Sequence, residues 1–461
     1  MNFFEKIYDI TPVFIQNLMV SAYGYQLKKK KYTGVFFSKL EEFKRREIFT
    51  KQQFRDYQTI ELRKLLSHAF NTVPYYNEMY KKHGFNNSTF SKFELEDLIK
   101  LPFLEKEALR KYGTTTLLSK EKKKGNFIST SGSTGTPIKI FYSQEFFQIW
   151  SALYEARVRN WAGIDLKMKR GMIGGRKILP DAVSTPPFYR YNLAEKQTYF
   201  SAYHISKKNL NNYIEGIINN DIEYMVGYAM SNYFLADLIV KNNCNVPKLK
   251  AVLTSSEKLT KEMRVTFMKA YNCRTFDAYS GVESCGLISE NMNGDFLWSS
   301  DVAIAEVIDE NYNYTQEGEL ISTGLLNFDQ PLIRYRIGDF IKVSENQETK
   351  SGSKMLKIDE ISGRLEDVIT TADGRKIISL YRLFSDIPYL KLSQVIQNSF
   401  TNYVINIVVE SSFSEKEERK IKQRFFEKIG TNVTLSINKV NNITKEKNGK
   451  YKLTISKIKN A

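Results

Sequence analysis

Strand-like and helical stretches alternate between residues 127 and 290, and this alternation limits the available folds more than any other feature of the sequence. Short apolar runs such as Phe127–Ser129 and Ala251–Thr254 are typical of strands, whereas Gln144–Trp161 and Tyr228–Asn242 are helix-like. Strands that alternate with helices build a largely parallel sheet covered by helices. The sequence therefore predicts an α/β fold.

The stretches on either side have other patterns. Residues 50–120 carry apolar side chains at helical spacing, and Pro74 interrupts that pattern. Residues 296–345 are rich in strand-like runs. We therefore expect a helical N-terminal region of about residues 1–120, and a β-rich portion later in the same large domain.

The pattern changes again after Gly363, where a compact tail begins. It is predicted to contain a strand, a charged helix and a second strand, over Tyr403–Val409, Ser414–Ile429 and Val433–Val440. This order of elements indicates a small α+β domain. We predict a large N-terminal domain over residues 1–363 and a small C-terminal domain over residues 364–461.

The composition is that of an ordinary globular chain. Of 461 residues, 42% are hydrophobic and 26% are charged, which excludes a disordered chain, a collagen-like repeat and a multi-span membrane protein. The few cysteines and histidines are scattered, at Cys244, Cys273, Cys285, His68, His83 and His204. Such spacing predicts neither a disulfide scaffold nor a zinc module, and a reducing cytoplasm is the expected compartment.

The chain is strongly basic. Lysine and arginine number 68 against 51 aspartates and glutamates, which gives a formal net charge of +17. Such an excess can serve nucleic acid, an anionic membrane surface or a polyphosphate substrate. Nucleic acid is disfavoured because no RNA-binding, zinc-finger or helix-turn-helix signature accompanies the lysine runs.

The N-terminal segment raises the question of membrane contact. The apolar stretch Pro12–Tyr25 is interrupted by Gln16 and Asn17, so it is too short and too polar to span a bilayer. We expect an amphipathic helix that ends near Gly24, followed by the basic run Lys28–Lys31. A helix packed on the protein is the favoured interpretation. Peripheral association with the inner face of an anionic membrane is the alternative.

A loop rich in hydroxyl residues and glycine follows the strand-like stretch Phe127–Ser129. Its sequence is Thr130-Ser131-Gly132-Ser133-Thr134-Gly135-Thr136-Pro137. Glycines let backbone N–H groups approach an anion, and Ser and Thr hydroxyls add donors. The Gly-Lys-Ser/Thr ending of a Walker motif is missing. We interpret the segment as a polyphosphate-binding loop. On composition alone, a flexible polar loop is the alternative.

A second segment pairs an aromatic residue with a carboxylate. Tyr279 can stack on a purine, and Glu283, four residues later, can hold Mg²⁺ through its oxygens. Taken alone, the same pair also fits simple packing and a surface acid.

Three further segments carry candidate residues. Asp339 can accept both hydroxyls of a ribose. Arg334 and Arg336 alternate and would share one face of a strand, where a cross-strand salt bridge is an equal interpretation. Gly363–Asp367 lies at the predicted domain boundary. Lys450 follows a glycine in a lysine-rich tail, which by itself predicts only a solvated side chain.

Together and in this order, these five segments resemble the adenylate-forming (AMP-binding, acyl-CoA synthetase-like) superfamily. Thr130–Pro137 resembles its phosphate-binding loop and Tyr279–Glu283 its Tyr-Gly-x-Thr-Glu segment. Tyr335–Asp339 is similar to its Tyr-Arg-x-Gly-Asp, and Gly363–Asp367 to its hinge. Lys450 matches its catalytic lysine.

The closer resemblance is to the phenylacetate–CoA ligase family and its capsule-biosynthesis (CapK-type) branch, and it covers nearly the whole chain. The segments that carry it are Leu62–Leu66, Val73–Tyr76, Gly174–Arg176, Pro186–Phe188, Arg190–Asn192, Ser201–His204 and Gly449–Lys452.

The resemblance implies a two-step reaction. A carboxylic acid attacks the α-phosphate of ATP–Mg²⁺ to give an acyl-adenylate, and the acyl group then passes to a thiol such as CoA. It implies catalytic roles for Lys450, Glu283 and Arg364, with Glu283 also the Mg²⁺ ligand, and a hinge at Glu366 for a mobile C-terminal domain. The implied ATP or AMP contacts are Thr130, Ser131, Gly132, Ser133, Thr134, Gly135, Ser256, Glu257, Tyr279, Ser280 and Asp339.

Several positions depart from the family pattern. Ser280 stands for the usual Gly, Val282 for the usual Thr, and Glu366 for the usual hinge Asp. The segment that ends Ser256-Glu257 normally ends Gly-Glu. ATP binding is still expected, whereas the efficiency of catalysis is left open.

We predict an AMP-forming carboxylate ligase that serves capsular or surface polysaccharide synthesis. The acceptor is left open between the CoA thiol and a sugar amine or hydroxyl. The alternatives are a catabolic aryl- or acyl-CoA ligase, and a non-catalytic peripheral membrane component of polysaccharide assembly. Residues 175–230, including His204, Gly227 and Tyr228, are expected to line the acyl pocket, although a histidine such as His204 is more often simply packed.

Overall fold

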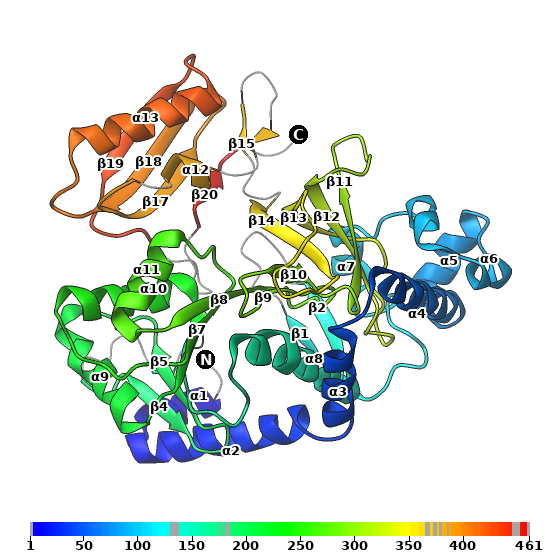
Figure 1. Ribbon diagram of the computed structural model, residues 1–461, viewed down its shortest axis with the longest axis horizontal. Helices are drawn as coiled ribbons and strands as arrows, with labels where there is room; N and C mark the ends of the chain where they lie inside the picture. Colours follow the sequence, from blue (N-terminus) through cyan, green and yellow to red (C-terminus); the bar gives the residue numbers. More distant parts are fainter. Residues whose placement is uncertain are drawn as a thin grey trace. The chain divides into compact units, whose positions relative to one another are not determined.

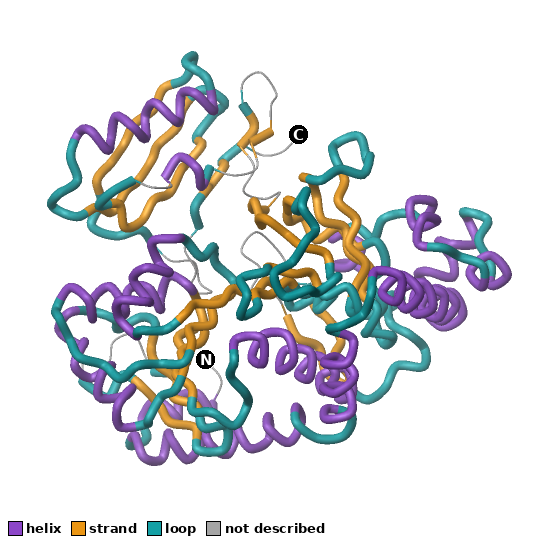
Figure 2. The backbone as a smooth tube through the Cα atoms, in the orientation of Figure 1, coloured by secondary structure: helices purple, strands orange, loops and turns teal. Residues whose placement is uncertain are grey.

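In the computed structural model the chain divides into two units (Figure 1; Figure 2). The large unit contains Met1–Glu306, Ile321–Arg336 and Val343–Ile358, and the small unit contains Val307–Leu320, Ile337–Lys342 and Asp359–Ala461. The residues that the structure describes are 3–129, 138–174, 176, 178–179, 185–364, 369–371, 376–377, 380–384, 387–444 and 452–458. The expected domain division at residues 363 and 364 stays a prediction.

A mixed sheet of twelve strands forms the centre of the described chain, in the order β11-β12-β13-β14-β10-β9-β8-β7-β6-β3-β5-β4. Its strands are β3 (Arg170–Gly174), β4 (Tyr189–Asn192), β5 (Gln197–Ser201), β6 (Tyr224–Tyr228), β7 (Ala251–Ser255), β8 (Arg274–Tyr279), β9 (Ile288–Glu290), β10 (Phe296–Trp298), β11 (Ala303–Ile308), β12 (Glu317–Gly324), β13 (Tyr335–Val343) and β14 (Leu356–Arg364). The last four in this list contribute residues to both units.

Strands β5, β3, β6, β7 and β8 are parallel to one another, as the alternating sequence pattern predicts. Side chains of a strand alternate between the two faces of a sheet. In β7, Ala251 and Leu253 accordingly join one buried apolar cluster and Val252 joins another. Burial on both faces explains why such strands are apolar throughout.

Helices cover these faces. The apolar cluster that contains Ala251 and Leu253 also contains residues of α3 (Phe36–Arg46) and α8 (Gln144–Tyr154). The cluster that contains Val252 also contains residues of α9 (Leu210–Asn219), α10 (Ala229–Lys241) and α11 (Lys261–Tyr271). A π-helical turn (η2, Glu155–Arg159) and a 3₁₀ turn (η3, Asn160–Ala162) continue α8, and the 3₁₀ turn η4 (Lys207–Asn209) precedes α9. The predicted α/β fold is therefore confirmed.

The N-terminal region is helical, as expected. Its elements are α1 (Phe3–Ile10), α2 (Val13–Lys31), α3, α4 (Lys51–Thr72), α5 (Pro74–Lys82), α6 (Asn87–Ser91), the 3₁₀ helix η1 (Leu95–Lys100) and α7 (Lys106–Tyr112). Thr50 and Gln53 form a reciprocal capping box at the start of α4, and Pro74 takes the first position of α5. No helix in the described ranges is long and apolar enough to cross a membrane.

The expectation that the N-terminal helix ends near Gly24 is wrong. Helix α2 continues through Gly24 to Lys31. A Cβ atom at Gly24 would lie 2.2 Å from side-chain atoms of Asn192 in β4. This glycine therefore allows a close approach between helix and strand, which a local pattern does not distinguish from a helix end.

The small unit contains the elements predicted for the tail. A sheet of order β19-β18-β17-β20 consists of β17 (Leu390–Gln397), β18 (Asn402–Val409), β19 (Thr434–Lys439) and β20 (Thr454–Ser456). Helix α13 (Glu415–Ile429) begins with a capping box of Ser414 and Glu417 and buries Ile421, Phe425 and Ile429. The remaining described elements are β15 (Ile369–Thr370), β16 (Lys376–Ile377) and α12 (Tyr381–Phe384).

A buried ion pair connects the N-terminal helices to the sheet within the large unit. Arg334 donates to both carboxylate oxygens of Glu306, from Nε at 3.0 Å and from Nη2 at 2.9 Å. Its Nη1 donates to the carbonyls of Ile99, at 3.1 Å, and of Leu101. Both charged side chains are 4% exposed. The salt-bridge interpretation of Arg334 is therefore confirmed.

Arg336 differs, because it contacts Glu105 at 3.3 Å near the surface. The expectation that the two arginines share one face of a strand is wrong, because Arg334 precedes β13 and has φ of +47°. Both guanidinium groups nevertheless lie over the Phe103 ring, at 4.3 Å for Arg334 and 5.6 Å for Arg336.

We expect Glu306→Gln to destabilise the large unit by about 3 kcal/mol, because it leaves the Arg334 charge buried without its counter-ion. Urea unfolding followed by tryptophan fluorescence measures this. The matched control is Glu105→Gln, which breaks the exposed pair with Arg336 and should cost less than about 1 kcal/mol. Equal costs for the two variants would contradict the assignment.

Candidate functional site

The parallel strands β5, β3, β6, β7 and β8 have their carboxyl ends on the same side of the sheet. The predicted site segments follow these strand ends. Residues that pair across these ends are Ser201 with Gly174, Gly227 with Ile173, Ser255 with Tyr228, and Ala278 with Ser255. In open α/β sheets, ligands bind outside the carboxyl ends of the strands. The fold thus brings to one edge the segments that contain His204, Tyr228, Ser256, Glu257 and Tyr279.

The loop after β8 is held by internal hydrogen bonds. The Ser280 hydroxyl donates to the carbonyl of Gly286 at 2.9 Å. The Tyr142 phenol donates to the carbonyl of Val282 at 2.7 Å and contacts the Ser284 hydroxyl. Because a phenol has one proton, Ser284 donates in that second contact. Ser280 and Ser284 therefore fix the loop that carries Glu283.

Tyr142 also connects this loop to the strand pair on either side of residues 130–137. It lies in β2 (Lys139–Ser143), which pairs antiparallel with β1 (Gly125–Ser129). The segment from residue 130 to 137 joins these two strands. Burial raises the pKa of the Tyr142 phenol, so it stays a hydrogen-bond donor at neutral pH.

Glu283 is half-buried and oriented by a second motif. The Tyr335 hydroxyl donates to Glu283 Oε1 at 3.3 Å, across 52 positions of sequence. Burial, and then the neighbouring Glu283 charge, raise the pKa of Tyr335 well above its ordinary value, so the phenol remains a donor. A Cβ at Gly281 would lie 2.4 Å from Glu283 Oε2. Glycine at 281 therefore leaves the room that the carboxylate occupies.

Ser256 and Glu257 lie between β7 and α11, and each has a local structural role. Ser256 has φ of +69°, in the left-handed region where glycine is favoured, which explains why the resembling family has glycine there. Glu257 Oε2 accepts a hydrogen bond of 2.8 Å from the backbone N–H of Met230 at the start of α10. A carboxylate at a helix N-terminus is stabilised by the helix dipole. Nucleotide contact by these residues stays a prediction.

Asp277, in β8, precedes Tyr279 by two residues, and the sequence argument did not assign it a role. Its Oδ1 accepts from the Thr254 hydroxyl at 3.1 Å. Burial raises the pKa of this carboxyl to about 7, with the charge of Glu290 adding to the rise, while the Thr254 bond and Arg264 oppose it. The sequence signal for Asp277 was its position two residues before the Tyr279–Glu283 segment. Its neighbours come from β7, β9 and α11.

We expect Asp277→Asn to change the pH dependence of stability. The native carboxyl has a higher pKa than the ordinary value of 3.8, so native protein holds a proton that unfolded protein has lost between about pH 4 and pH 7. Stability of the natural protein should therefore contain a component that falls as the pH rises through this range. Urea midpoints at several pH values should show that component missing from Asp277→Asn. Parallel pH curves for the two proteins would contradict the raised pKa.

The acyl-pocket candidates have structural explanations in the described chain. His204 Nδ1 lies 2.7 Å from the Ser201 hydroxyl, and its ring stacks on Phe188 with centroids 5.1 Å apart, which fits a packed histidine. Gly227 has φ of +138°, and a Cβ there would lie 1.8 Å from the Ile173 carbonyl oxygen, so glycine is required by strand packing. Tyr228 is the residue before α10. Contact of these three with an acyl group stays a prediction.

Several predicted residues lie outside the described chain. These are Thr130, Ser131, Gly132, Ser133, Thr134, Gly135, Glu366 and Lys450. Arg364 is described only as the last backbone position of β14. Asp339 lies in β13 and is buried, after Gly338 with φ of +80°, in the part of the strand that belongs to the small unit.

The fold has known counterparts. A solved structure of 2-hydroxyisobutyryl-CoA ligase in its postadenylation state matches with a TM-score of 0.70 and 16% sequence identity, over 89% of this chain and 91% of that chain. At this identity the similarity concerns the fold. The fold of this chain is therefore shared with a known CoA ligase.

Sequence comparison narrows the assignment. The chain is 28% identical over 460 residues to Protein CapK of Staphylococcus aureus, which covers 98% of this chain and 99% of CapK. It is 25% identical over 362 residues to phenylacetate-coenzyme A ligase of Pseudomonas putida, over 68% of this chain and 71% of that enzyme. Residues 369–457 match the CapK C-terminal domain family. The chain is therefore similar over nearly its whole length to Protein CapK and over about two thirds of its length to a phenylacetate-coenzyme A ligase, and its C-terminal part matches the CapK C-terminal domain family.

Proposed function

We propose that this chain is an ATP-dependent, AMP-forming ligase that activates a carboxylic acid as an acyl-adenylate. The observation that carries this proposal is the hydrogen bond from Tyr335 to Glu283, because it joins two motif segments beside the ends of the parallel strands. The relatives named as CoA ligases support the same chemistry.

The first half of the proposed reaction forms the acyl-adenylate. A carboxylate oxygen of the acid attacks the α-phosphorus of ATP, and pyrophosphate leaves. Tyr279 at the end of β8 would contact the adenine face, and Asp339 the ribose hydroxyls. The backbone N–H groups and hydroxyls of residues 130–135 would hold the phosphates. Lys450 would stabilise charge that grows on the α-phosphate oxygens.

Glu283 is the proposed protein ligand of Mg²⁺. Within the described ranges, no group of three histidine, cysteine, aspartate or glutamate side chains could hold a metal ion. A single oriented carboxylate fits Mg²⁺, which is usually bound by one or two carboxylates together with substrate phosphates. When bound, Mg²⁺ neutralises phosphate charge. Tyr335 would position the Glu283 carboxylate by donating to one of its oxygens, and the other oxygen faces the space left by Gly281.

The second half would pass the acyl group to an acceptor, which we propose to be the CoA thiol or a sugar amine or hydroxyl. A role in surface polysaccharide synthesis is favoured over aryl-acid catabolism. The similarity to CapK extends over 98% of the chain, whereas the similarity to phenylacetate-coenzyme A ligase extends over 68%. Acyl transfer to CoA alone, together with preference for an aromatic acid, would favour the catabolic alternative.

The first test is ATP–pyrophosphate exchange across a library of carboxylic acids. We expect exchange that requires both Mg²⁺ and one class of acid. Glu283→Gln should raise the Mg²⁺ concentration needed for exchange without lowering the melting temperature, because an amide is a poorer metal ligand of nearly the same shape. Glu345→Gln, which changes an exposed glutamate, is the charge-matched control. An unchanged Mg²⁺ titration would make Glu283 structural, and no exchange with any acid, combined with no ATP binding by calorimetry, would refute the ligase.

The role of Lys450 can be separated from the second half-reaction. We expect Lys450→Ala to lose about 10²–10³-fold in the rate of adenylation, the scale for removal of one preorganised charge-stabilising donor. The variant should still transfer the acyl group when it is given preformed acyl-adenylate. Lys457→Ala, an exposed lysine of the same tail, serves as the control. Equal loss in both half-reactions would indicate a folding role.

A further inference from the structure

Helix α2 contacts the protein through polar side chains as well as through Val20, while several of its large apolar side chains lie at the surface. On the inner side, the Asn17 Oδ1 atom accepts from the backbone N–H of Tyr191 at 2.9 Å, and the Ser21 hydroxyl accepts from the N–H of Leu193 at 3.0 Å. Gln16 is buried and accepts from the Arg190 guanidinium. Val20 packs on the apolar core beside these contacts, so both apolar and polar groups attach the helix to the protein.

The inner contacts have a structural cause. Strand β4 is the last strand of the sheet order, so its outer N–H groups have no strand to pair with. The amide and hydroxyl groups of Asn17 and Ser21 satisfy those donors in place of another strand. In Figure 1, α2 runs beneath β4 and β5.

A stripe of exposed apolar side chains runs along α2 next to Ser21. Phe14 and Leu18 are each 65% exposed and Tyr25 is 64% exposed, and these positions recur at i, i+4 and i+11, on one side of a helix. Ile10, at the end of α1, is 83% exposed, and Leu193, in the turn after β4 beside Ser21, is 67% exposed. Exposed apolar patches of this kind indicate a binding surface.

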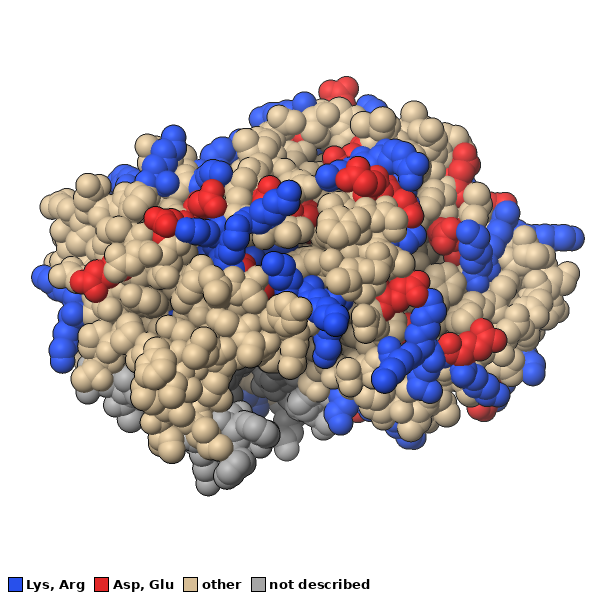
Figure 3. All heavy atoms as spheres, turned by 90° about the horizontal axis from the view of Figure 1, so that it is seen from below, with Lys and Arg blue, Asp and Glu red and all other residues tan. Residues whose placement is uncertain are grey.

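A basic group continues the stripe at its C-terminal end. Lys28, Lys29 and Lys30 are exposed, and within the described chain none has an acidic group within ion-pair distance. Lys31 differs, because it pairs with Glu195 at 3.4 Å. Figure 3 views the molecule from the side on which α2 lies, and it shows surface without charged side chains next to a band of Lys and Arg.

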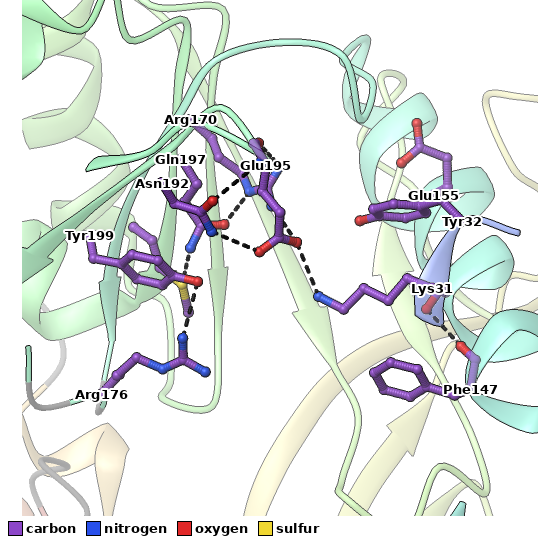
Figure 4. Close-up of polar contacts among 12 residues, drawn as sticks. Lys31, Tyr32, Phe147, Glu155, Arg170, Arg176, Asn192, Glu195, Gln197 and Tyr199 are labelled. Carbon is purple, nitrogen blue, oxygen red and sulfur yellow. Dashed lines mark hydrogen bonds and ion pairs between the residues drawn. The ribbon is translucent and has the colours of Figure 1, made fainter. Parts of the chain in front are cut away.

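A cavity of about 110 Å³ opens beside this basic group. It is lined by Lys28, Tyr32, Leu166, Lys167, Arg170, Ala194, Glu195 and Lys196. Figure 4 shows that Glu195 is already engaged by Arg170 at 3.3 Å, by Asn192 at 3.2 Å and by Lys31. The remaining cations, Lys28, Lys167 and Lys196, therefore give this cavity an excess of positive charge suited to a phosphate group.

We propose that the α2 surface, formed by Ile10, Phe14, Leu18, Tyr25, Leu193 and Lys28–Lys30, binds the headgroup region of an anionic phospholipid bilayer. The apolar stripe would enter the boundary between headgroups and acyl chains while the lysines contact lipid phosphates. Because the lysines are clustered at one end of the stripe, α2 would lie in the plane of the membrane.

Charge favours a lipid surface over a second copy of this chain. The chain has a net charge of +17, so two copies repel each other, whereas an anionic bilayer attracts each copy. The surface contains none of the residues proposed for catalysis. Failure of the membrane proposal would therefore leave the ligase proposal standing, and the reverse also holds.

The test is co-sedimentation of the full-length protein with vesicles. We expect binding to vesicles that contain phosphatidylglycerol in phosphatidylcholine, much weaker binding to phosphatidylcholine alone, and release at high salt. Phe14→Ser with Leu18→Ser should weaken binding about tenfold or more, because two exposed apolar side chains are lost. Lys28→Gln, Lys29→Gln and Lys30→Gln together should weaken it about a hundredfold, at about fivefold for each lysine.

Matched variants separate this surface from the general positive charge. Lys269→Gln, Lys416→Gln and Lys420→Gln remove the same charge from exposed lysines on α11 and α13. Val265→Ser with Met268→Ser removes exposed apolar side chains from α11. Both control variants should bind vesicles nearly as the natural protein does, and the melting temperature of every variant should stay close to that of the natural protein.

Three results would overturn the proposal. The first is equal loss of binding in the control and α2 variants, which would mean diffuse electrostatic attraction. The second is equal binding to neutral and anionic vesicles. The third is self-association in sedimentation velocity that Phe14→Ser with Leu18→Ser abolishes, without any vesicle binding by the natural protein, which would make α2 an interface between copies.

Discussion

The bidentate ion pair between Arg334 and Glu306 is the interaction on which the large unit most depends. A buried arginine is tolerated only when its charge and its donors are satisfied. Glu306 satisfies the charge, and the carbonyls of Ile99 and Leu101 take the remaining donor, so one side chain holds two strands and the segment that follows η1. The next residue is Tyr335, whose hydroxyl reaches Glu283. The geometry of the proposed metal ligand therefore follows from this ion pair.

The site is built by sheet topology rather than by any single loop. Parallel strands that are neighbours in space end at the same edge, so segments far apart in sequence meet there without special contacts. The hydrogen bonds of Tyr142, Ser280 and Ser284 then fix the loop after β8. One departure from the family pattern, Ser280, therefore has a structural role in this loop, whereas nothing in the structure explains Ser256, which has φ of +69° where glycine is favoured. The same departures leave the oriented carboxylate of Glu283 intact.

Local sequence patterns predicted helices and strands well, but they did not predict which side chains contact each other in the folded protein. The apolar run at β7, the charged helix that begins near Ser414 and the break at Pro74 all depend on residues close in sequence, and all were predicted. Gly24 was misread because its reason, a close approach to Asn192, lies in another element. Glu283 could be placed from its motif, but the partner Tyr335 could not. The raised pKa of Asp277 likewise depends on Thr254, Glu290 and Arg264, which come from three different elements.

Because α2 bonds to the edge strand β4 through its side chains, the first thirty or so residues close the edge of the sheet. An open edge strand offers its backbone to any extended segment nearby, including a strand of another molecule. Here the edge is closed by side-chain amide and hydroxyl groups from a helix, which leaves no ladder for a further strand to extend. The N-terminal helix is therefore part of the architecture of the sheet itself, and its outer face can vary in sequence without disturbing the strand that it closes.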